Sequence, residues 1–239
     1  MVESIFFFVL AFLVLVLLVL GFETVGFRLS EAVLIFVGSP LLFFSLDPSI
    51  VVYVYGALGL GIFVPPLQFA VFQPFFVVGP SSNLAIGFDA AGFLIPFFIS
   101  LKMMFDRRSP ITASLIGIAC IAAVSYLSSV YVAGEGVVIS NIYVIAIAAS
   151  IIGIVLAKRQ WGSVGPIAYV SGSLGVLLGA DLAHIGDVLA YQPKGFAFAS
   201  IGGAGVFDAI FLVGVLAVTI DVIFVENVRL INWIQRRLA

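Results

Sequence analysis

Charge is the scarcest property of this sequence of 239 residues. Only 9% of the residues are Asp, Glu, Lys or Arg, whereas 63% are hydrophobic. A soluble domain has about 25% charged residues, so this chain has too few charges to cover a soluble fold. The composition therefore excludes an ordinary soluble protein and indicates one that lies in a lipid bilayer. The net charge of −2 at pH 7 argues against a nucleic-acid partner.

Cysteine and histidine are almost missing, with one residue of each. The lone Cys120 allows no disulfide within the chain, and one histidine without a cysteine cluster argues against a typical zinc site. The sequence also lacks a GxxxxGK[ST] phosphate loop and an HExxH motif. We therefore expect neither a bound metal of this kind nor a cofactor, whereas a carboxylate site for another cation stays open.

Long runs of apolar residues make up most of the sequence. A transmembrane helix needs about 20 mostly apolar residues, and runs of this length recur along the chain. We predict an all-α bundle of about eight transmembrane helices, with a re-entrant or interfacial segment at 64–80, where four prolines interrupt an apolar run. The predicted spans are 4–22, 30–46, 49–66, 84–104, 110–132, 138–157, 165–186 and 203–226.

The loops between these spans differ in positive charge. One side of the membrane receives only Arg28 and Lys194. Cytoplasmic loops carry an excess of Lys and Arg, so the pattern predicts a multi-pass protein of the cell membrane with both termini in the cytoplasm. The cytoplasmic side then holds Lys102, Arg107, Arg108, Lys158, Arg159, Arg229, Arg236 and Arg237.

The chain divides into one long membrane domain and a short tail. Residues 1–227 are predicted as a single polytopic domain, and residues 228–239, VRLINWIQRRLA, as a cytoplasmic amphipathic helix on the membrane surface. The lipid bilayer is the expected partner. A homo-oligomer and further subunits both stay open.

Ionisable residues inside the apolar runs predict where a site lies. Asp181 and His184 fall in SGSLGVLLGADLAHIG (171–186), and Asp208 falls in SIGGAGVFDAIFLVG (200–214). Such groups cost roughly 2.5–3.5 kcal/mol at a bilayer centre and mostly face a bundle interior or a hydrated cavity. The predicted topology places all of them in the outer third of the membrane. We expect an outward-facing site of Asp181, His184 and Asp208, with Asp89 as a candidate fourth member.

The spacing in this region has a functional and a structural interpretation. Asp181 and His184 share one face of a regular helix, where they could exchange protons near neutral pH or simply pin a helix end. Gly172, Gly175 and Gly179 give the same segment a small surface. They indicate either close helix packing or a discontinuous helix that lines a substrate path.

Residues 165–217 resemble a family of prokaryotic membrane proteins known only as a domain of unknown function. The resemblance rests on an AYV-G-LG-L-GADL stretch followed by SIGGAG-FD-IFL-G, and it extends to DAAGFLIPFFISL (89–101) and more faintly to FVPPL (63–67). The positions of Asp181 and Asp208 fit the family pattern, whereas the family typically has Asn at the position of Asp89. The resemblance implies a membrane topology and no assigned activity.

Three function classes fit these features. The first is a small transporter or channel, in which Asp181, His184, Asp208 and Asp89 bind a cation or relay protons. The second is an intramembrane aspartyl hydrolase with Asp181 and Asp208 as its catalytic pair, because GAD and FD loosely resemble the motifs of presenilin-type proteases. The third is a membrane subunit of a larger complex with a quinone pocket.

Overall fold

The computed structural model describes residues 2–41, 75–76, 84–158, 160–192, 197–203 and 207–238, which are mostly helical. Its α-helices are α1 (Val2–Thr24), α2 (Leu29–Val33), α5 (Ile95–Phe105), α6 (Ile111–Ser128), α7 (Ile142–Leu156), α8 (Trp161–Val176), α9 (Ile185–Ala190) and α10 (Ala209–Leu238). Three π-helical turns extend neighbouring helices: η1 (Leu34–Gly38) continues α2, η2 (Ala90–Leu94) leads into α5, and η3 (Leu177–Leu182) continues α8. The strands are β1 (Phe75–Phe76), β2 (Leu84–Phe88), β3 (Ser129–Val132), β4 (Gly136–Ile139) and β5 (Ala197–Ile201).

Three described helices are long and apolar enough to cross a membrane, rather than the predicted eight. They cover Ile111–Ser128, Trp161–Ala190 and Ala209–Arg236. Four shorter apolar helices cover Phe12–Thr24, Leu29–Leu41, Ala91–Phe105 and Ile142–Leu156. The predicted span at 49–66 and most of the predicted segment at 64–80 lie outside the described residues. The other seven predicted spans all contain helix, but several are cut short by strands.

The strands correct the all-α prediction. β3 and β4 form an antiparallel hairpin where the spans at 110–132 and 138–157 were expected to end and begin. Gly134 lies in its turn and Gly136 begins β4, and their φ angles of +85° and +100° suit glycine. A second sheet has the order β1-β2-β5, and its β2 and β5 are parallel. Short runs rich in Val, Ile and Phe suit a strand as well as a buried helix, so hydrophobicity alone did not separate the two.

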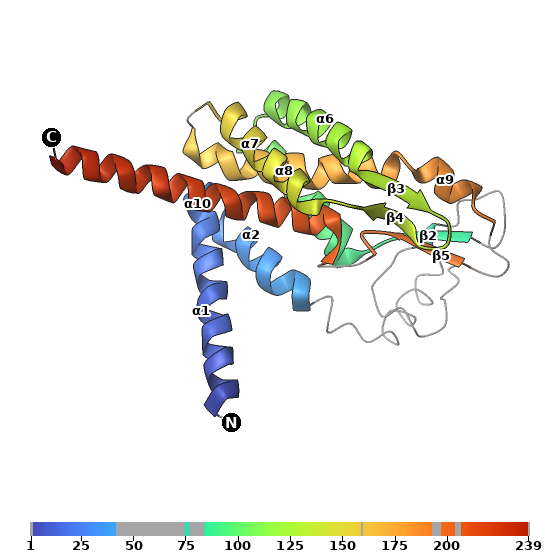
Figure 1. The fold of residues 1–239 in the computed structure, drawn as a ribbon, viewed down its shortest axis with the longest axis horizontal. Coiled ribbons are helices and arrows are strands. Elements are labelled where there is room, and N and C mark those ends of the chain that lie inside the picture. The colour runs from blue at the N-terminus through green and yellow to red at the C-terminus, as the bar shows by residue number, and fades with distance from the viewer. Residues whose placement is uncertain are drawn as a thin grey trace.

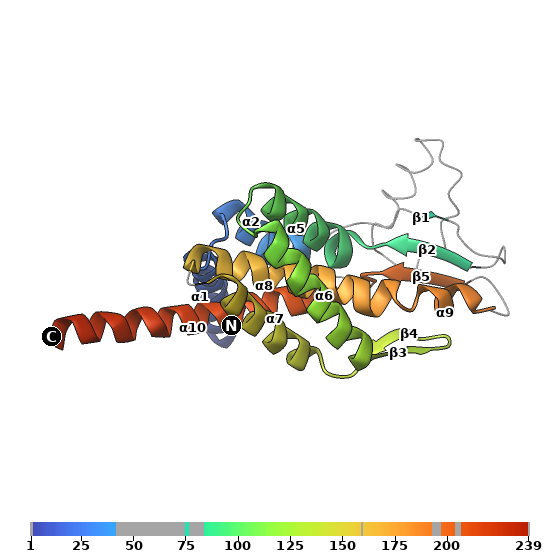
Figure 2. The ribbon, with the colours of Figure 1, turned by 90° about the horizontal axis from the view of Figure 1, so that it is seen from above.

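Helix α8 lies at the centre of the bundle and contacts α5, α6, α7 and α10 (Figures 1 and 2). Its glycines allow these close contacts. A Cβ added to Gly175 would lie 2.6 Å from the Ile121 Cβ, and one added to Gly179 would lie 2.0 Å from the Ala122 carbonyl oxygen on α6. Gly172 instead faces Val213 on α10. The small residues of α8 therefore serve packing against two different helices.

Arg28 lies at the opposite end of the bundle from the one that eight alternating spans predict. Its Nη1 is 3.0 Å from the Asp106 Oδ2 in the loop after α5. The turn between α1 and α2 thus shares one end with the loop that carries Arg107 and Arg108. The prediction was wrong here because few charges mark the first spans, so an error in their number went undetected.

The two terminal helices extend away from the bundle. Helix α1 lies across α10 rather than alongside it, and the C-terminal part of α10 continues beyond the other helices (Figures 1 and 2). The segment predicted as a separate amphipathic helix, 228–239, continues α10 to Leu238 without a break. Leu230, Ile231 and Trp233 are exposed there.

Candidate functional site

Asp181 lies in the π-helical turn η3, where α8 loses its regular hydrogen bonding. The Ala183 N–H donates to the Leu178 carbonyl at 3.1 Å, a step of five residues instead of four. Turns of this kind are rare and occur frequently at functional sites. The sequence places Asp181 after Gly179 and Ala180, both buried, so the carboxylate is held on a segment that is tightly packed against α6.

Asp208 begins α10 as its N-cap residue. Its Oδ1 accepts a hydrogen bond of 2.9 Å from the Ile210 N–H, and its carbonyl accepts one of 2.8 Å from the Leu212 N–H. A carboxylate at this position satisfies a free backbone donor and is favoured by the positive end of the helix dipole. In chain order, α10 follows the strand β5.

Asp181 and Asp208 interact electrostatically in the structure. The two carboxylates are close enough for the charge of Asp208 to act on Asp181. Asp181 lies in η3, where α8 departs from regular helical hydrogen bonding, and Asp208 lies at the N-terminus of α10. Two carboxylates held together in an apolar bundle repel each other unless a proton or a cation lies between them. This pair is the centre of the candidate site.

His184 makes its described contacts with Ala180 and Tyr126. Its Nδ1 lies 2.8 Å from the Ala180 carbonyl oxygen, and its ring stacks on Tyr126 with centroids 5.4 Å apart. A carbonyl oxygen only accepts, so Nδ1 carries the hydrogen. The predicted Asp181–His184 pair assumed a regular helix, and η3 removes the shared face. His184 instead satisfies a carbonyl at the end of the interrupted helix.

We expect His184→Ala to lower the free energy of unfolding by about 2 kcal/mol, because it removes both a hydrogen bond and an aromatic contact. His184→Asn keeps a donor near Ala180 and should recover about half of that loss. Denaturant unfolding of the purified protein in detergent measures both. Equal losses for the two variants would mean that the hydrogen bond contributes nothing.

Asp89 is fully buried at the junction between β2 and η2. Its hydrogen bonds to described residues are with backbone groups and not with Asp181 or Asp208. Its Oδ1 accepts a hydrogen bond of 2.6 Å from the Gly92 N–H, and its own N–H donates to the Ile201 carbonyl at 2.9 Å. These contacts join the start of α5 to the end of β5. The structure therefore gives Asp89 a role in building the strand-to-helix junction.

Asp221 is a buried carboxylate that the sequence analysis did not select. It lies on α10 with no exposed surface, and its Oδ1 accepts a hydrogen bond of 2.6 Å from the Ser150 hydroxyl of α7. The signal that could have found it is the one that found Asp181, an ionisable residue within an apolar run. Asp221 lies near the end of the predicted span at 203–226, where an ionisable side chain can also reach the membrane surface.

Carboxylates alone make up the ionisable part of this site. Across the described ranges, no group of three or more His, Cys, Asp and Glu side chains could hold a metal ion. A pair of carboxylates suits a proton or a cation of low charge, which needs fewer charged ligands.

Comparisons with known proteins give a family and no activity. A family model described as a protein of unknown function (DUF1614) matches residues 68–220, which include Asp89, Asp181 and Asp208 and end just before Asp221. No curated protein and no solved structure matches the chain.

Proposed function

This chain belongs to the DUF1614 family of proteins of unknown function, and from that premise we propose that it is a membrane protein that transports protons or a small cation. Asp181 and Asp208 form the binding site. The observation that carries the proposal is the electrostatic interaction between these two carboxylates, one in the π-helical turn that continues α8 and the other at the N-terminus of α10.

Interrupted helices support a transport function for a physical reason. Discontinuous helices near a bound ion are typical of secondary transporters, because their broken turns provide polar backbone groups within the membrane. Here η3 supplies the break in α8, and Asp208 caps the N-terminus of α10. Proton or cation binding would remove the repulsion between the two carboxylates, and release would restore it.

The positive charges at one end of the bundle support a proposed orientation of the protein in the membrane. Arg28, Lys102, Arg107 and Arg108 lie at the end away from Asp208, and we propose that this end faces the cytoplasm of a prokaryotic cell. The carboxylate pair then lies toward the outside. Helix α10 runs toward the basic end, and α1 lies across the bundle at that end (Figure 1), so the proposal keeps both termini on the cytoplasmic side.

Flux measurements in liposomes test this function. We expect the purified protein to move protons, Na⁺ or K⁺ across vesicles under an imposed potential, read by a pH-sensitive dye or by tracer uptake. Asp181→Asn and Asp208→Asn should each lower the flux at least about tenfold, the effect of losing about 1.4 kcal/mol of binding. Asparagine also caps helices well, so Asp208→Asn removes the charge and keeps the start of α10.

Asp187→Asn is the matched control. Asp187 is exposed on α9, six residues after Asp181, and its replacement makes the same change in charge. We expect its flux to stay within about twofold of wild type, an effect of less than 0.5 kcal/mol. Wild-type flux that is insensitive to Asp181→Asn would contradict the proposal. Cleavage of a membrane peptide that requires both aspartates would instead favour the hydrolase, and stable co-purifying subunits would favour a complex.

A further inference from the structure

A second buried carboxyl group lies on α10, closer to the basic end. Asp221 has no exposed surface, and of its two oxygens only Oδ1 has a partner, the Ser150 hydroxyl at 2.6 Å. Its Oδ2 is buried and makes no hydrogen bond within the described part of the chain. An ionised carboxylate with one oxygen bare in an apolar interior is strongly disfavoured.

No positive side chain in the described ranges neutralises Asp221. Helix α7 presents the Ser150 hydroxyl to it. Glu23 on α1 is exposed, and Lys102 on α5 forms ion pairs elsewhere. Since no ion pair is available, a proton on Oδ2 is the simplest way to remove the charge.

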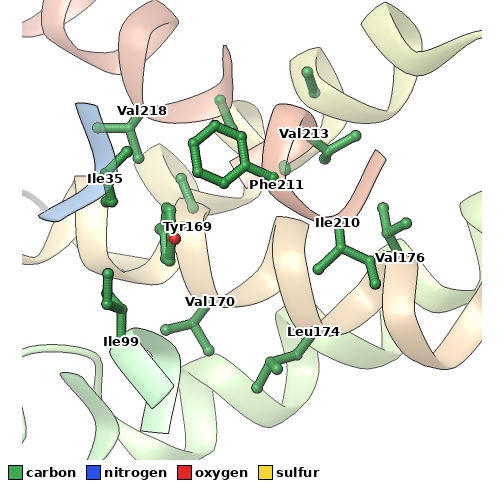
Figure 3. Packing of buried hydrophobic residues seen from close by; sticks show 14 of the residues in the cluster. Ile35, Ile99, Tyr169, Val170, Leu174, Val176, Ile210, Phe211, Val213 and Val218 are labelled. Atoms are coloured by element: carbon green, nitrogen blue, oxygen red, sulfur yellow. The ribbon is translucent and has the colours of Figure 1, made fainter. Parts of the chain in front are cut away.

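Two further buried hydroxyl groups lie at the contact between α8 and α10, nearer the middle of the bundle. A Cβ added to Gly214 on α10 would lie 2.3 Å from the Ser173 Oγ and 3.1 Å from the Tyr169 ring, so both side chains of α8 face that glycine. Asp221 follows Gly214 by seven residues, two turns along the same face of α10. The hydroxyls of Tyr169 and Ser173 are buried and have no partner within the described ranges. Figure 3 shows Tyr169 among core side chains of α10, including Phe211 and Val218.

We propose that Asp221, with Ser150, is a second proton-binding site, and that the buried face between α8 and α10 connects it with the Asp181–Asp208 pair. This inference rests on the proposed function and narrows its substrate to the proton. Binding transfers one proton from hydronium to Oδ2, which yields a neutral carboxylic acid and one water. The Ser150 hydroxyl donates to Oδ1 and orients the carboxyl group.

Infrared spectroscopy of the full chain in liposomes tests the site without relying on transport. A protonated carboxyl group gives a carbonyl band that is separate from the bands of carboxylate. We expect the wild-type protein to show such a band near pH 7 and Asp221→Asn to lose one component of it. Asp187→Asn should leave the band unchanged. In Ser150→Ala the component should persist to higher pH, because the variant lacks the hydroxyl that stabilises the ionised form.

The infrared carbonyl band tests the Asp221 site, and the proton flux tests the transport function, so the two proposals can fail separately. If Asp221→Asn removes the component and also lowers the proton flux about tenfold, both the site and the route are supported. If it removes the component while the wild-type protein moves no protons, the site stands and the transport function fails. A wild-type spectrum identical to that of Asp221→Asn from pH 5 to 9 would overturn the second site. Unchanged proton flux in Asp221→Asn, with flux lost in Asp181→Asn, would overturn the route.

Discussion

Gly26→Ala should prevent the chain from reaching its native fold. Gly26 ends α1 at a φ of +109°, and an added Cβ would lie 1.9 Å from the Gly162 carbonyl oxygen at the start of α8. The atom that it meets is backbone, so no side chain can move to relieve the contact. The left-handed conformation adds a cost of roughly 1–2 kcal/mol for any residue other than glycine. We therefore expect Gly26→Ala to lower the free energy of unfolding by more than about 4 kcal/mol.

The turn around Gly26 explains why the chain needs glycine there. The Phe27 N–H donates to the Phe22 carbonyl at 3.1 Å, and the Gly26 N–H donates to the Glu23 carbonyl at 3.2 Å. This is the Schellman arrangement, which requires a left-handed residue after the helix. The rings of Phe22 and Phe27 pack with centroids 4.9 Å apart across it. The turn therefore fixes how α1 leaves the bundle.

Two other glycines act as controls for this prediction. Gly136→Ala has a positive φ of +100° and open space around the added Cβ, so it should cost only about 1–2 kcal/mol. Gly162→Ala has open space and no positive φ, so it should change stability by less than about 0.5 kcal/mol. Yield of monodisperse protein and thermal unfolding in detergent measure all three. A Gly26→Ala protein as stable as Gly136→Ala would mean that the contact with α8 relaxes.

The helices could be predicted from the sequence, but the strands and the topology of the first spans could not. Apolar length identifies α6, α8 and α10 because few other structures need such runs. The hairpin of β3 and β4 was missed because Val, Ile and Tyr suit either state until their neighbours are known. The position of Arg28 depends on Asp106, 78 residues later, and no local pattern reports such an ion pair.

At the candidate site too, some residues could be predicted from the sequence alone, and others depend on how the helices pack. The cost of an ionisable group in a membrane predicted that Asp181 and Asp208 matter, and the structure places them within electrostatic reach. The role of His184 could not be predicted, because helical spacing assumes a regular helix and η3 is not regular. Asp221 was missed because the sequence does not show which face of α10 is buried against α7.

Glu31→Gln should cause the second large loss of stability, about 3–5 kcal/mol, because it removes the shared partner of two cations. The Glu31 side chain is 4% exposed. Its Oε1 binds Lys102 Nζ at 2.6 Å and also Arg108 Nη2, and its Oε2 binds Arg108 Nη1 at 2.7 Å. The Arg28 N–H donates to the same carboxylate at 3.0 Å. Without this carboxylate, Lys102 and Arg108 keep only Asp106, whose Oδ2 lies farther away, at 3.5 Å from Lys102 Nζ and 3.6 Å from Arg108 Nη2.

Acid should reproduce this loss in the wild-type protein. Burial by itself raises the pKa of Glu31, but hydrogen bonds from Arg108, Lys102 and the Arg28 backbone outweigh it and lower the pKa from 4.5 to about 2. The folded state therefore holds the ionised form more strongly than the unfolded state does. The resulting stability is fully present above pH 4.5 and is lost as the pH falls toward 2. Glu31 lies outside the three helices that are long and apolar enough to span a membrane.

Glu226→Gln is the matched control, since Glu226 pairs with Arg229 at 2.8 Å in an exposed position on α10. An exposed pair contributes about 1 kcal/mol or less, so this variant should unfold almost like the wild type and keep its acid sensitivity. Glu31→Gln should already be destabilised at pH 7. Because it lacks the Glu31 carboxyl group, its free energy of unfolding should fall less than that of the wild type between pH 4.5 and 2. Denaturant unfolding in detergent across this pH range distinguishes the cases. If Glu31→Gln kept the full acid sensitivity of the wild type, the cluster that joins α2, α5 and the loop before α6 would not be what stabilises this end of the protein.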